Sequence, residues 1–74
     1  VGEVVSVNPD NGTAVIWLAT RHLVLPGKVI TRNHEMETTA TLEPTTLRGG
    51  RALGMEIISG RPRMGDEVVF QSGN

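Results

Sequence analysis

The sequence predicts an all-β domain, a single small antiparallel barrel of five to six short strands in 74 residues. Valine, isoleucine and threonine occupy 21 positions, and such β-branched side chains pack well on a pleated sheet. Nine glycines and four prolines interrupt the chain at short intervals, and no window has the apolar i, i+3, i+4, i+7 spacing of a helix. So short a chain has room for one sheet, and closing that sheet removes its unpaired edges.

The first two expected strands, 2–7 and 13–18, form a hairpin. The segment between them holds Pro9, Asp10 and an Asn-Gly pair, which are typical residues of a tight turn. In 13–18, Ala14, Ile16 and Leu18 share one face, while Val15 and Trp17 share the other. Both faces are apolar, so this strand is expected to be central or to lie in a closed barrel.

The third and fourth expected strands are 28–32 and 37–43. A Leu-Pro-Gly segment at 25–27 precedes the first of them, and 33–36 is expected to turn between them. The second alternates between a face of Thr38, Ala40 and Leu42 and a polar face. This period of two predicts a half-buried strand.

The last two expected strands are 52–58 and 67–70, and a loop is expected at 44–50. Leu53, Met55 and Ile57 share one face of 52–58, and Gly54 suggests a bend. Gly65 allows a sharp turn into the last strand, where the Asp66 side chain is expected to accept a backbone N–H. The barrel is therefore expected to span 1–70, followed by a polar tail at 71–74.

Composition excludes several classes of function. The chain has no cysteine, which excludes disulfides, thiolate metal sites and a cysteine nucleophile. Its net charge is -1, and no apolar run approaches the roughly 18 residues of a membrane span. His22 and His34 lack metal-ligand spacing, and no serine stands in a nucleophile elbow. We therefore expect no catalytic residue, no metal and no cofactor, and a protein that is not an enzyme.

Apolar residues around the second strand form the candidate partner interface. Trp17 and Phe70 are expected to serve the core, although Trp17 has the alternative role of an interface anchor. Leu23, Val24 and Leu25 follow it as three consecutive apolar residues. They are expected either to plug the barrel end or to form an exposed patch for a partner. The candidate interface comprises Trp17, Leu23, Val24 and Leu25.

Arginines dominate the charge of the second half. Segment 1–43 has three basic and five acidic side chains, and segment 44–74 has four and three. If the arginine-bearing loops meet, their guanidiniums can face phosphates or carboxylates. Alternatively, the arginines solubilise loops or pair with Glu35, Glu37 and Glu43 of a neighbouring chain. The candidate anion or nucleic-acid contacts are Arg48, Arg51, Arg61 and Arg63.

Four segments together resemble a known family. They are Gly2-x-Val-Val-x-Val7, Gly12-x-Ala-Val-Ile16, Leu25-Pro-Gly-Lys-x-Ile30 and Ile58-Ser-Gly-x-Pro-x-Met-Gly-Asp-Glu-Val68. Their order is similar to that of small SH3-like barrels of bacterial envelope and secreted proteins, such as the C-terminal barrel of the flagellar assembly protein T family. The resemblance spans 2–69 and implies a non-catalytic assembly module.

The residues and the resemblance together predict a non-enzymatic module of protein–protein assembly. We expect it to belong to a bacterial envelope or surface structure, exported in preference to cytoplasmic, and to bind a protein partner or copies of itself as a homo-oligomer. The alternative is a nucleic-acid-binding barrel that uses an arginine-bearing loop face. That alternative requires the four arginines to form one stripe.

Overall fold

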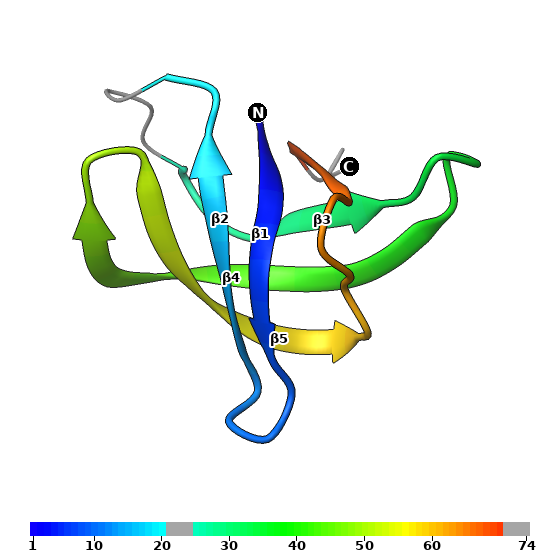
Figure 1. Ribbon diagram of the computed structural model, residues 1–74, viewed down its shortest axis with the longest axis horizontal. Coiled ribbons are helices and arrows are strands. Elements are labelled where there is room, and N and C mark those ends of the chain that lie inside the picture. The colour runs from blue at the N-terminus through cyan, green and yellow to red at the C-terminus, as the bar shows by residue number, and fades with distance from the viewer. Residues whose placement is uncertain (21–24, 71–74) are drawn as a thin grey trace.

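The computed structural model describes residues 1–20 and 25–70, and its strands confirm the predicted all-β barrel. Within these residues the chain forms six strands and no helix, so no helix is long and apolar enough to cross a membrane. Figure 1 shows the strands wrapped around a single interior. Their bounds are β1 (Gly2–Asn8), β2 (Thr13–Leu18), β3 (Val29–Arg32), β4 (Thr38–Gly49), β5 (Ala52–Gly60) and β6 (Glu67–Phe70).

The barrel closes in the order β1-β2-β5-β4-β3-β6, and every neighbouring pair is antiparallel. The seam between β1 and β6 is short, because only Gly2 and Glu3 of β1 pair with β6 in register. Val4 extends this seam with two further backbone hydrogen bonds, to Gly65 and Asp66. A register shift then follows in β1 between Val4 and Ser6.

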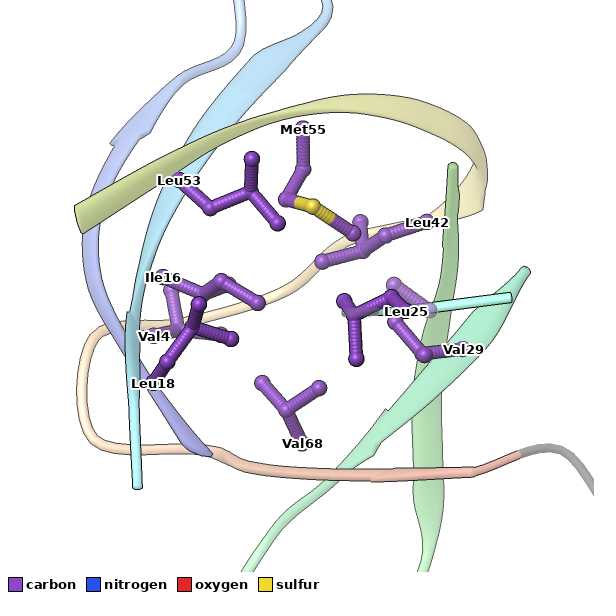
Figure 2. Close-up of a cluster of buried hydrophobic side chains, with 10 residues drawn as sticks. Val4, Ile16, Leu18, Leu25, Val29, Leu42, Leu53, Met55 and Val68 are labelled. Carbon is purple, nitrogen blue, oxygen red and sulfur yellow. The ribbon is translucent and has the colours of Figure 1, made fainter. Parts of the chain in front are cut away.

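One apolar cluster fills the barrel (Figure 2). The inner face of β2 contributes Ile16 and Leu18, which are fully buried, as the alternation of this strand predicts. Leu53 and Met55 of β5 point inward in the same way. The buried cluster is Val4, Ile16, Leu18, Leu25, Val29, Ala40, Leu42, Leu53, Met55 and Val68.

The prediction of a loop at 44–50 is wrong, because β4 continues through these residues to Gly49 and turns directly into β5. Pro44 has no backbone N–H to donate, and it lies where the pairing with β5 shifts register, between Pro44 and Arg48. The hydroxyl of Thr45 donates to the carbonyl oxygen of Gly54 at 2.8 Å across this irregularity. The proline therefore marks a bulge within a long strand, a position at which sheets tolerate it.

A buried carboxylate fastens the segment that leads into β6. Asp66 is 6% exposed, and its Oδ2 accepts hydrogen bonds from the Thr39 hydroxyl at 2.7 Å and from the backbone N–H of Arg63 at 2.9 Å. The Thr39 hydroxyl also lies 2.6 Å from the hydroxyl of Thr31 on β3. This confirms that Asp66 accepts a hydrogen bond from a backbone N–H. Its bond with Thr39 also connects it to β4 and, through the Thr31 hydroxyl, to β3.

Candidate interaction surface

Trp17 lies on the outside of the barrel, which corrects the expectation that it serves the core. Its neighbours Ile16 and Leu18 point inward, so Trp17 must point outward, and its side chain is 45% exposed. Across the sheet it pairs with Ala52 of β5, and Val15 pairs with Gly54. These small partners leave the outer faces of the two larger side chains uncovered.

Leu47 extends this surface from the neighbouring strand. The bulge in β4 places Leu47 over β5, so that its Cβ lies 3.1 Å from the position that a Cβ on Gly54 would take. Leu47 is 74% exposed, and with Val15 and Gly54 it lines a shallow hollow of about 140 Å³. We define the outer apolar face as Val15, Trp17, Leu47, Ala52 and Gly54. Its residues belong to β2, β4 and β5.

Arg51 holds Trp17 in a fixed position. Its guanidinium carbon lies 5.3 Å from the centre of the indole ring, within the range of a cation–π interaction. The same guanidinium donates to the carbonyl oxygens of Leu18 at 2.8 Å and Ala19 at 2.9 Å. Both groups also line a hollow of about 370 Å³ at this end of β1 and β2. The tryptophan is thus partly exposed and in contact with Arg51.

Leu25, the other described residue of the candidate interface, does not join this surface. Leu25 is buried in the core, where it helps to plug the barrel, and it is therefore not an exposed contact. Leu23 and Val24 lie outside the described residues, as does His22. Phe70 is 46% exposed on β6, so the expectation that it serves the core is also wrong. Of the two candidate residues that the structure describes, Trp17 lies on the outer apolar face and Leu25 does not.

The four candidate arginines fall into two groups. Arg48 and Arg51 flank the turn from β4 to β5, whereas Arg61 and Arg63 follow the end of β5. Figure 1 shows these two segments on opposite sides of the molecule, with the length of β5 between them. Arg61 and Arg63 line a larger hollow of about 560 Å³ together with apolar side chains. The structure therefore does not bring the four guanidiniums into one stripe.

The titratable side chains do not converge on a site. His34 is exposed in the turn between β3 and β4. In the two described ranges, no group of three or more His, Asp or Glu side chains is placed to hold a metal ion. Glu67 pairs with Arg32 at 2.9 Å across the outer surface of β3 and β6. The buried carboxylate of Asp66 is engaged by Thr39 and by a backbone N–H.

Sequence reasoning missed Leu47 because it placed 44–50 in a loop, and it therefore did not place Leu47 over Gly54 of the predicted strand 52–58. The available signal was Gly54, which indicates a close approach of another chain segment within a strand. No family model, curated protein or solved structure matches this chain. The outer apolar face must therefore be interpreted from its own chemistry.

Proposed function

We propose that this barrel is a non-enzymatic module of protein–protein assembly, and that it binds its partner through the outer apolar face. The observation that carries this proposal is Trp17, a large aromatic side chain that is 45% exposed on a rigid sheet and held by Arg51. Tryptophan and arginine are the residues most enriched among the energetically dominant contacts of protein interfaces. Their pairing at one exposed position favours a protein partner.

The construction of the face supports the same function. Small residues at Ala52 and Gly54 leave space beside Trp17 and Leu47, into which side chains of a partner can pack. The barrel interior is filled by its own apolar cluster (Figure 2). Binding energy must therefore come from the outer surface. Because the face lies on paired strands, little ordering entropy is lost on association.

The first partner to consider is another copy of the chain. The resemblance to SH3-like barrels of envelope and secreted proteins extends the proposal to an assembly of the bacterial envelope or surface. Nucleic-acid binding is less well supported, because the turn between β4 and β5, which Arg48 and Arg51 flank, and the segment after β5, which carries Arg61 and Arg63, lie on opposite sides of the molecule (Figure 1). A gel-shift titration at low salt tests it directly, since binding through arginines must weaken steeply as salt is added.

Self-association through the outer apolar face is measured by sedimentation equilibrium and by Trp17 fluorescence over a concentration series. Trp17 is the single tryptophan, so its emission reports burial of this face alone. We expect the emission to shift to shorter wavelength as the mass rises. Truncating a dominant interface residue costs about 2 kcal/mol, or roughly thirtyfold in affinity, and Trp17→Ala should show this loss.

The matched control is Phe70→Ala, which removes an aromatic side chain of almost equal exposure, 46%, from β6. It should leave association unchanged, and Leu47→Ala should weaken it. A protein that stays monomeric up to about 1 mM, with constant Trp17 emission, would refute self-association through this face. Equal losses in Trp17→Ala and Phe70→Ala would show that the contact is not specific to it.

A further inference from the structure

The hollow that follows β5 is lined by apolar side chains and by two arginines. Val7, Pro9 and Ile57 contribute apolar lining, and Pro62 lies between the two lining arginines, Arg61 and Arg63. Its volume of about 560 Å³ lies in the range of ligand-binding pockets. Within the part of the chain that the structure describes, neither guanidinium of these two arginines makes a hydrogen bond or an ion pair. The hollow therefore suits an apolar side chain that has carboxylates beside it.

The turn between β3 and β4 has the complementary pattern. Met36 is 63% exposed, and it stands between two glutamates, Glu35 and Glu37. Asn33 fixes this turn, because its Oδ1 accepts the backbone N–H groups of Glu35 at 2.9 Å and of Glu37 at 3.1 Å. The backbone N–H of Met36 donates to the carbonyl oxygen of Asn33 at 3.0 Å. The turn thus holds one apolar side chain outward with a carboxylate at either side in sequence.

We propose that the hollow binds this turn of a second copy of the chain. In that contact Met36 enters the hollow, and the flanking glutamates meet Arg61 and Arg63. Guanidinium and carboxylate groups form short, charge-assisted and often bidentate hydrogen bonds. Burial of a methionine side chain adds apolar area to the same contact. Because this surface is separate from the outer apolar face, the inference goes beyond the proposed function.

The position of the two surfaces favours a twofold dimer. The backbone N–H of Arg61 donates to the carbonyl oxygen of Thr39 at 2.9 Å, and Thr39 lies two residues beyond Glu37. The end of β5, which borders the hollow, therefore lies beside the start of β4, and the turn projects beyond that start (Figure 1). Two copies related by a twofold axis can each place their turn in the hollow of the other, which makes the contact twice and closes the pair.

Charge reversal tests this dimer in the full 74-residue chain. One double variant carries Arg61→Glu and Arg63→Glu, and the other carries Glu35→Arg and Glu37→Arg. Each alone places like charges in both contacts, and we expect its dimer dissociation constant to rise at least a hundredfold. In an equimolar mixture every contact again joins opposite charges, so a dimer of twice 8.0 kDa should reappear in sedimentation velocity. The wild-type dimer should weaken at about 1 M salt, where the screening length is about 3 Å.

A second variant keeps the test independent of the reversed charges. Met36 has a φ of 65°, a conformation that glycine adopts without strain. Met36→Gly should therefore melt at no lower temperature than the wild type, yet dimerise at least tenfold more weakly. If each double variant alone dimerised as strongly as the wild type, the inference would be overturned. A mixture of the two that stays monomeric would overturn it as well.

The failure of this inference is distinguishable from failure of the proposed function. Trp17→Ala should leave the charge-dependent dimer intact. Conversely, the double variants should not change a salt-insensitive association that is reported by Trp17 emission. A dimer that is lost in Trp17→Ala and retained in both double variants refutes the twofold contact and supports the outer apolar face.

Discussion

Replacement of Asp66 by alanine should remove a large part of the stability of the barrel. The carboxylate is 6% exposed, and it accepts two hydrogen bonds, from the Thr39 hydroxyl and from the backbone N–H of Arg63. These bonds hold the segment before β6 against β4. Because β1 and β6 pair over only two residues, barrel closure depends strongly on this segment.

The magnitude follows from the two hydrogen bonds. A hydrogen bond to a charged group contributes about 1.5–3 kcal/mol, and a buried donor left without an acceptor costs a similar amount. The Thr39 hydroxyl can still donate to the Thr31 hydroxyl, because their oxygens are 2.6 Å apart. Part of the lost stability is therefore recovered. We expect Asp66→Ala to lower the free energy of unfolding by about 3–4 kcal/mol. At about 0.05–0.15 kcal/mol per residue, a domain of this size has a free energy of unfolding of roughly 4–11 kcal/mol.

Urea denaturation followed by circular dichroism measures this loss. Asp66→Asn keeps one acceptor oxygen and should lose less stability than Asp66→Ala. The neighbouring carboxylate provides the control, because the side chain of Glu67 is 54% exposed in its ion pair with Arg32. Glu67→Ala should therefore cost less than about 1 kcal/mol. An Asp66→Ala protein within about 1 kcal/mol of the wild type would refute the assigned role of the buried carboxylate.

Two further predictions concern the backbone at Gly60 and the contact between Arg51 and Trp17. A Cβ at Gly60 would overlap the carbonyl oxygen of Thr39, and φ at Gly60 is +83°. At Gly65 φ is +91° but the space is open, so Gly65→Ala should cost only about 1–2 kcal/mol of stability. Gly60→Ala should therefore lower the melting temperature more than Gly65→Ala. Arg51→Ala removes two hydrogen bonds to backbone carbonyls and the contact with the indole ring, so it should cost about 1–2 kcal/mol and change the emission of Trp17. An unchanged emission spectrum would contradict the contact, and equal melting temperatures for the two glycine variants would contradict the overlap.

The strands were predictable wherever their signals are local. Alternation of apolar and polar side chains located β2 and the first half of β4, and the Pro-Asp-Asn-Gly segment located the turn between β1 and β2. The second half of β4 was not predictable in this way. It is held by pairing with β5 and by the hydrogen bond from Thr45 to Gly54. Such long-range pairing leaves no local pattern, and Pro44 favoured a loop.

The location of Trp17 required knowledge of the barrel. The two apolar faces of this strand predict that it is central or lies in a closed barrel, and Trp17 is expected to serve the core because of its apolar neighbours Val15, Ile16 and Leu18. In a closed barrel, however, each strand has one inward face, and here Ile16 and Leu18 occupy it. The apolar side chains of the other face must remain outside. Two apolar faces on a strand of a small barrel therefore predict an exposed apolar surface, which is consistent with the alternative role of Trp17 as an interface anchor.

The small size of the domain does not limit it to one interface. A standard interface takes about 800 Å² from each partner, whatever the partner's size. The surface of this chain is 4864 Å², so each such interface occupies about one sixth of it. The outer apolar face and the hollow after β5 are lined by different residues, and both can be occupied at once. A twofold contact joins chains in pairs, and a second, separate contact is needed to join pairs into larger assemblies. If both proposals hold, Trp17→Ala should stop assembly at the dimer, whereas either charge-reversed variant alone should retain only the contact made by the outer apolar face.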